Sequence, residues 1–112
     1  MNPKFIDMDT NIQVRYASHP NDVKHYTTQQ LRESFLVDNL FEPDKVNIIY
    51  SDYDRFIVGG IFPTSKQISL KPIDILKASF FLERRELGII NIGGKAVISN
   101  WYNNHYHITC IL

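Results

Sequence analysis

Short apolar runs, separated by glycine and proline, constrain the fold of this chain more than any other feature of its sequence. Val46, Ile48 and Tyr50 recur at every second position, as residues on one face of a strand do. Pro63 and Pro72 end the runs that precede them, because proline cannot donate a hydrogen bond to a sheet. The runs are shorter than an average helix, so the sequence from residue 46 onward predicts β structure.

Strands are expected along most of this region. Their predicted bounds are residues 46–50, 55–62, 67–70, 79–84, 89–92 and 95–98. Many short strands with glycine and proline between them are typical of a sandwich or a small barrel. The predicted fold class is therefore mainly β, a barrel or sandwich preceded by one short helix.

The predicted helix begins at Thr27. Its hydroxyl can accept from a free backbone amide of the first turn while the Gln30 side chain reaches back, which is the capping-box arrangement. Leu31 and Phe35 then give an apolar stripe at helical spacing. We expect the helix to end near residues 38–39.

Three parts follow from this division of the chain, whose 112 residues suffice for one domain. Residues 1–26 are polar and without sustained periodicity, which indicates an irregular arm. Residues 27–98 hold the helix and the strands and form the expected domain. Residues 99–112 are crowded with asparagine, tyrosine and histidine and are expected to form a separate tail.

Charge and cysteine content argue against several classes of protein. Lys+Arg and Asp+Glu both number 12, so no net charge draws the chain to nucleic acid or an anionic membrane. Zero net charge instead favours self-association. Cys110 is the only cysteine, so no internal disulfide can form. Asp7 and Asp9 lie where a signal peptide needs an apolar core, and no apolar stretch is long enough to cross a bilayer, so we expect a soluble cytoplasmic protein.

His105 and His107 are the first candidates for local chemistry. Residues two apart on a strand share a face, so both imidazoles could bind one metal ion. A zinc site needs at least a third protein ligand, which would come from Asp52, Asp54 or another distant residue. The alternative is an incidental pair in a tail without structure, and we favour this alternative.

The cluster at residues 83–86 is the second candidate. On a strand, Glu83 would share a face with Arg85, and Arg84 with Glu86. An arginine here could bind a substrate carboxylate with its planar guanidinium. Structural ion pairs, or a contact between subunits, are the more common use of such residues and are favoured.

Three further features have structural explanations. Asp52 and Asp54 could form an acid–base pair, but a Ser-Asp-Tyr-Asp run favours a turn in which the acids bond nearby amides. The pairs Gly59-Gly60 and Gly93-Gly94 lack the spacing of a phosphate loop and indicate bulges or bends. Cys110 has no partner and is given no role.

Three segments carry a family resemblance. Residues 80–94 closely resemble a stretch in the N-terminal half of the 4-deoxy-L-threo-5-hexosulose-uronate ketol-isomerases, also called 5-keto-4-deoxyuronate isomerases. Residues 54–61, followed by Pro63, resemble a second stretch of that family, and residues 31–37 a third. The segments keep the family's order and spacing, so the likeness covers roughly residues 28–98.

The resemblance implies a fold, an activity and a cofactor. Family members are two-cupin proteins, usually hexamers, so the domain would be a cupin-like N-terminal barrel that is itself incomplete. They are aldose–ketose isomerases of pectin and galacturonate breakdown and convert 5-keto-4-deoxyuronate (5-dehydro-4-deoxy-D-glucuronate) to 3-deoxy-D-glycero-2,5-hexodiulosonate. Their metal is expected to be zinc, held by three histidines and a glutamate. A metal suits this reaction because it stabilises the enediolate left when a base removes a proton.

The sequence departs from the family in two respects. The four metal ligands belong to the family's C-terminal barrel and correspond to no residue here, so no zinc is expected on this chain and its catalytic and substrate-binding residues are unknown. After Ile98 the family pattern ends. We therefore expect a truncated, poorly soluble chain, inactive by itself, with a tail of other origin. Two alternatives remain: a non-catalytic cupin-like scaffold or oligomerisation module, and a minimal metalloenzyme built on His105 and His107.

Overall fold

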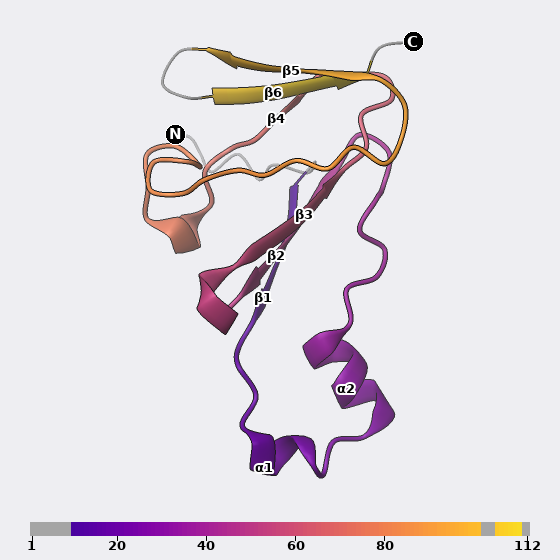
Figure 1. Ribbon diagram of the computed structural model, residues 1–112, viewed down its shortest axis with the longest axis vertical. Helices are drawn as coiled ribbons and strands as arrows, with labels where there is room; N and C mark the ends of the chain where they lie inside the picture. Colours follow the sequence, from indigo (N-terminus) through magenta and orange to yellow (C-terminus); the bar gives the residue numbers. More distant parts are fainter. Residues whose placement is uncertain (1–9, 102–104, 111–112) are drawn as a thin grey trace, which may run out of the picture. The chain divides into compact units, whose positions relative to one another are not determined.

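The chain folds into two compact units, Met1–Ile61 and Phe62–Leu112, and each is described by itself. Figure 1 shows the computed structural model, which describes residues 10–101 and 105–110, with side chains described up to residue 99. Each unit contains one three-stranded sheet. The structure confirms a mainly β fold with a small helical content.

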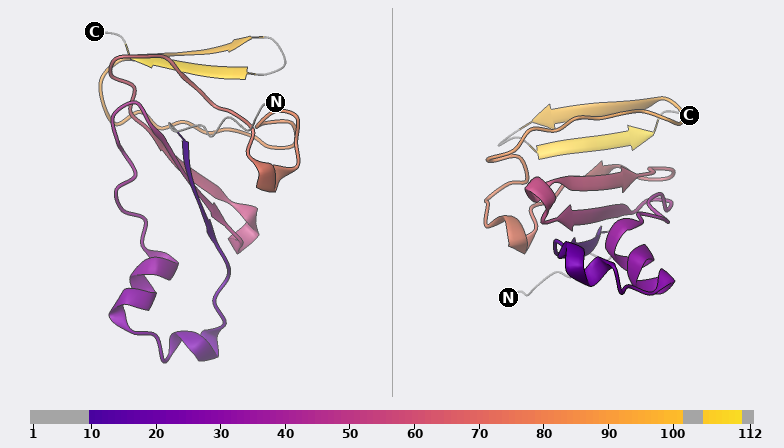
Figure 2. Two further views of the ribbon diagram at one scale, coloured as in Figure 1. Left: turned by 180° about the vertical axis from the view of Figure 1, so that it is seen from behind. Right: turned by 60° about the horizontal axis from the view of Figure 1, so that its bottom comes forward.

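The sheet of the first unit is mixed. Its strands are β1 (Thr10–Arg15), β2 (Val46–Ser51) and β3 (Ile57–Ile61), in the order β1-β2-β3. β2 pairs in parallel with β1 and antiparallel with β3, and the left view of Figure 2 shows the three strands side by side. A parallel pair needs a long crossover, and the helical segment between β1 and β2 supplies it.

β2 forms the core of this unit. Every residue from Val46 to Tyr50 is buried, including the polar Asn47. A strand with a neighbour on each side and both faces covered reads as a nearly continuous apolar run, which explains why Ile49 is buried between the alternating positions. The strand predicted at residues 46–50 is confirmed.

The helical segment holds α1 (Pro20–Val23) and α2 (Thr28–Phe35). The predicted capping box is confirmed: the Gln30 amide donates to Thr27 Oγ1 at 3.2 Å, and the Thr27 amide donates to Gln30 Oε1 at 2.8 Å. α2 ends earlier than predicted because Leu36 adopts extended backbone angles, φ −94° and ψ 134°.

An asparagine network ties the segment after α2 to the sheet. Asn47 Nδ2 donates to the Leu40 carbonyl at 2.9 Å, and Asn11 Nδ2 donates to Asn47 Oδ1 at 2.8 Å. On β3, a Cβ added at Gly60 would lie 2.4 Å from the Leu40 carbonyl oxygen. Asn47 and Gly60 thus hold Leu40 against the sheet by a hydrogen bond and by close approach.

The second unit carries an antiparallel sheet in the order β4-β6-β5. Its strands are β4 (Ile68–Ser69), β5 (Ala96–Trp101) and β6 (His105–Cys110), and a short 3₁₀ helix, η2 (Asp74–Leu76), lies in the long connection. The strands predicted at residues 67–70 and 95–98 are confirmed. Among the described side chains of this unit, the buried apolar ones include Ile68, Leu70, Ile73 and Phe81.

Two predicted strands are absent from the part of the chain that the structure describes. Residues 81–84 form a turn, in which the Glu83 amide donates to the Phe80 carbonyl at 3.2 Å. Residues 89–92 pair with no described strand, and Ile90 is 88% exposed. Both predictions were wrong for the same reason: alternating apolar residues form a strand only where a neighbouring strand accepts their hydrogen bonds.

Two segments predicted to be irregular contain strands. β1 lies within residues 1–26, and β6 lies within the tail 99–112. β1 lies at the edge of the sheet and pairs with β2 alone. Most of its residues are partly or fully exposed, so its sequence need not alternate strongly between apolar and polar residues. β6 likewise takes its register from β5, opposite which all six of its residues pair. The predicted domain boundaries at residues 26 and 98 stay predictions.

Closure into a barrel and the cupin assignment also stay predictions, since the described sheets have three strands each. Among the described residues, no helix has the length and apolar character needed to cross a bilayer.

Candidate functional site

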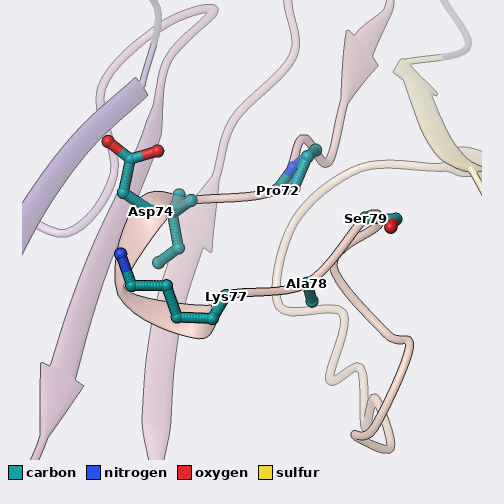
Figure 3. Close-up of a pocket in the computed structure, with 6 residues that line it drawn as sticks. Pro72, Asp74, Lys77, Ala78 and Ser79 are labelled. Atoms are coloured by element: carbon teal, nitrogen blue, oxygen red, sulfur yellow. The ribbon is translucent and has the colours of Figure 1, made fainter.

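An open hollow of about 310 Å³ lies in the second unit, beside η2. Figure 3 shows it in close-up. This site was not predicted, because the segment holds no motif of catalysis or phosphate binding and was expected only as a connection. Its lining residues are consecutive or nearly so: Pro72, Ile73, Asp74, Lys77, Ala78 and Ser79.

Local backbone chemistry shapes the hollow. Ile73 is extended and buried, which anchors the start of η2. Lys77 closes the 3₁₀ turn in the left-handed conformation, φ 49° and ψ 46°, with its amide donating to the Asp74 carbonyl at 3.1 Å. A left-handed lysine costs about 1 kcal/mol relative to the right-handed form, so neighbouring contacts must hold it.

Arg84 supplies those contacts. Its Nη2 atom donates to the Lys77 carbonyl at 2.6 Å and to the Leu76 carbonyl at 3.5 Å. Its Nη1 atom lies 2.6 Å from Glu83 Oε2, and Glu83 Oε1 accepts from the Ser79 amide at 3.3 Å. The Glu83–Arg84 pair thus stabilises the backbone at Lys77 and Ser79, two of the residues that line the hollow.

This arrangement corrects the predicted geometry of residues 83–86. They do not alternate across a strand, and the ion pair joins neighbours in sequence. The side chain of Arg84 is directed to backbone carbonyls, with about two-thirds of it still exposed. The favoured interpretation was a structural ion pair, and one is present between Glu83 and Arg84. Alternation along a strand would instead have paired Glu83 with Arg85.

The hollow is lined by both polar and apolar residues. In Figure 3 the Lys77 side chain runs back along the loop toward Asp74, while Ser79 lies at the other end. An ammonium group and a hydroxyl can donate to a carboxylate, and a carboxylate can accept from sugar hydroxyls. The six lining residues include one amine and one carboxylate, but no histidine or thiol.

Asp52 and Asp54 lie in the connection between β2 and β3, where a 3₁₀ turn (Tyr53–Arg55) reverses the chain. The predicted turn is confirmed, but the hydrogen bond expected from Asp52 to a nearby amide is not present at the start of the turn. The Asp52 side chain makes no cap hydrogen bond, and the Ser51 hydroxyl accepts from the Tyr53 amide at 3.1 Å instead. Asp54 adopts the left-handed conformation in this turn, φ 55°, which aspartate tolerates better than most residues do.

His105 and His107 both lie on β6, so the strand assumed for the histidine pair is present. In the ladder His105 is opposite Trp101, and His107 is opposite Ser99 on β5 and Ser69 on β4. The side chains on β6, Cys110 included, lie outside the described ones. Among the residues that were described, no group of three His, Cys, Asp or Glu could hold a metal ion.

The glycine pairs differ from each other. Gly59 and Gly60 pair in regular register with Ile48 and Asn47, so the predicted bulge is absent. A glycine is required at position 60 because a side chain there would collide with Leu40. Gly93-Gly94 forms a bend, as predicted, fixed by the Asn91 side chain, which accepts from the Gly93 amide and donates to the Gly94 carbonyl at 3.0 Å each.

No family model matches the chain. Curated proteins do. The chain is 50% identical over 91 residues to 4-deoxy-L-threo-5-hexosulose-uronate ketol-isomerase 1 of Bacteroides thetaiotaomicron, a match that covers 81% of this chain and 32% of that protein. It is 52% identical over 92 residues to the ketol-isomerase of the same name from Formosa agariphila, covering 82% and 33%. With that of Oceanobacillus iheyensis it shares 42% identity over 103 residues, covering 89% and 37%. The chain spans about a third of the length of the curated relatives it matches.

Proposed function

We propose that this chain, which corresponds to an N-terminal region of the 4-deoxy-L-threo-5-hexosulose-uronate ketol-isomerases, serves in the same isomerisation. The reaction would convert 5-keto-4-deoxyuronate to 3-deoxy-D-glycero-2,5-hexodiulosonate in the breakdown of pectin and galacturonate. The observation that carries this proposal is identity of about one half, sustained over four-fifths of the chain.

A ketol isomerisation moves a proton between neighbouring carbons, so it needs a base and a group that stabilises the enediolate. The zinc ion expected of the family would supply this stabilisation when bound. The residues described here do not fit such a site, because they bring no three ligand groups together. In line with the family resemblance, we propose that the zinc ligands lie in the part of the isomerase that this chain does not match, and we derive no step through the metal.

The role proposed for this region is structural support of the enzyme. We expect it to form part of a cupin-like barrel in a cytoplasmic hexamer. The hydrogen bonds of Arg84 and Glu83 favour this role, because both side chains are committed to the backbone of the hollow. The same observation supports the second candidate function, a non-catalytic scaffold or oligomerisation module.

A chimera tests the proposal directly. The matching region of the Bacteroides thetaiotaomicron isomerase is replaced by the matching residues of this chain, and turnover of 4-deoxy-L-threo-5-hexosulose uronate is measured. We expect kcat/KM within about tenfold of the parent enzyme, since a supporting region that keeps its fold leaves the reacting groups in place. The 112-residue chain alone is expected to show no turnover.

The control is the parent enzyme purified in parallel, with circular dichroism and size-exclusion chromatography on both proteins. A chimera that folds and assembles like the parent but lacks isomerase activity would contradict the proposed function. Activity of the 112-residue chain alone would contradict the purely supporting role.

A further inference from the structure

α2 presents an apolar face without a packing partner among the described residues. Leu31 and Phe35 are four positions apart and so lie on one side of the helix. Phe35 is 49% exposed, and no residue of α2 is buried. Figures 1 and 2 show α2 beyond the end of the β1–β3 sheet rather than over one of its faces. The name apolar α2 face is used for five exposed side chains, of which two lie on α2 and three in the segment that follows it: Leu31, Phe35, Leu36, Val37 and Phe41.

A helix of this length requires such a partner. α2 has eight residues, whereas isolated helices shorter than about 12–15 residues are marginal in water. The capping box at Thr27 satisfies two amides of the first turn but buries no apolar surface. In folded proteins most helical stability comes from packing of the apolar face, so the surface that covers this face is an essential part of the fold.

Two ion pairs lie close in sequence to the face. Arg32 lies 3.6 Å from Asp38, and Lys45 lies 3.4 Å from Glu42, so these four charges compensate each other in pairs. A partner that binds here gains from covering apolar area. Exposed apolar patches with a polar rim are typical of surfaces that become buried in an assembly.

The segment that follows α2 is held in place by the sheet. Asn47 binds the Leu40 carbonyl, and Gly60 allows Leu40 to approach β3 closely. The anchor lies between Val37 and Phe41, so the C-terminal end of the apolar α2 face is attached to the core of the first unit. A partner would therefore bind a face that is partly positioned in advance, which lowers the ordering entropy of binding.

We propose that the apolar α2 face docks onto the part of the isomerase subunit that this chain does not match. The matched region is 32% of the Bacteroides thetaiotaomicron relative, so about two-thirds of such a subunit is available to form the covering surface. This inference rests on the proposed function only in taking the ketol-isomerase family as the source of the partner.

The test uses Phe35→Glu in two proteins, the 112-residue chain and the chimera defined above. In the chimera the substituted side chain would place a charge in an apolar contact, and the melting temperature is expected to fall by roughly 5 °C or more. In the chain alone the position is exposed, so a change of no more than about 1 °C is expected. Gln29→Lys, at an exposed position on the opposite side of α2, is the control; it replaces the hydrogen bond from Gln29 to Glu33 by an ion pair four residues apart and should change both proteins little.

Three outcomes would overturn the proposal. An equal fall in both proteins would mean that the face packs within this chain. No fall in either would mean that the face stays exposed in the enzyme. A fall accompanied by dissociation of the chimera on size-exclusion chromatography would assign the face to a contact between subunits. An unsubstituted chimera that folds without isomerase activity would remove the proposed function and leave this thermal test intact.

Discussion

Two short segments of this chain are similarly apolar but have opposite environments. Residues 46–50 read Val-Asn-Ile-Ile-Tyr, and residues 89–92 read Ile-Ile-Asn-Ile. In the first, Val46 and Ile48 are 2% and 3% exposed, whereas in the second Ile90 and Ile92 are 88% and 74% exposed. β2 has a strand on each side, and residues 89–92 pair with none of the described strands.

The difference shows that an apolar pattern indicates which residues can be buried. Whether they are buried depends on the strands that pair with them. The same contrast applies to α2. Its capping box is formed as the sequence predicts, but its apolar side chains are not buried. For α2, the remainder of an isomerase subunit would supply the missing neighbour, as the docking proposal states.

The largest effect is expected from Ile48→Ala. Removing this buried side chain from the centre of β2 should lower the free energy of unfolding by about 2–5 kcal/mol, through lost burial and the cavity left behind. Urea unfolding followed by circular dichroism measures it. Ile90→Ala is the matched control in the chain alone and should change the free energy by less than about 0.5 kcal/mol. Similar losses at the two positions would remove the contrast between the two segments.

Gly60→Ala sharpens the contrast within one strand. The added Cβ would lie 2.4 Å from the Leu40 carbonyl oxygen, a backbone atom, so the fold must shift, at about 1–3 kcal/mol. At the neighbouring Gly59 the nearest atoms are 3.5 Å and 3.9 Å away, which is ordinary contact. Urea unfolding of both variants should therefore show a clear loss for the first and little change for the second. Equal effects would mean that Leu40 does not rest on β3.

Asn47→Ala tests the buried polar contact of β2. The substitution leaves the Leu40 carbonyl and the Asn11 amide group without this partner, which should cost about 1–3 kcal/mol. Asn11→Ala, which removes only the outer, less buried hydrogen bond, should cost less. Thermal unfolding of the two variants gives the comparison, and a larger loss for Asn11→Ala would contradict the assigned network.

Thr27→Ala gives the smallest effect, about 1 kcal/mol or less, because it removes only the cap of α2. The loss should be larger in the chimera than in the chain alone, since helix formation in the chimera is coupled to packing. Thermal unfolding of both proteins measures the difference, and Thr27→Ser, which keeps the hydroxyl, should restore most of it. A larger loss in the chain alone would speak against coupling.

Local chemistry determined how much of the fold could be predicted. The capping box at Thr27 was predicted correctly because both partners lie within four residues. β2 and β3 were predicted because their apolar runs are framed by turn residues, and the Ser51–Arg55 reversal contains the left-handed Asp54 that such turns favour.

What failed depends either on partners distant in sequence or on side-chain to backbone bonds that match no capping or turn motif. β1 is weakly patterned and takes its place from β2, so the pattern of residues 10–15 could not reveal it. The turn at residues 81–84 replaces a predicted strand because Glu83 binds the Ser79 amide and Arg84 binds the Lys77 carbonyl. These side-chain to backbone bonds also form the hollow, which is why the sequence predicted neither.

Hydrogen–deuterium exchange of the 112-residue chain and of the chimera tests the central claim most directly, namely that this chain is one region of an isomerase whose remainder covers its open apolar surfaces. We predict that amides of β2 exchange equally slowly in both proteins, because their partners β1 and β3 lie within the chain. Amides of α2 should exchange at least tenfold more slowly in the chimera than in the chain alone. Equal exchange of α2 in the two proteins would contradict the account.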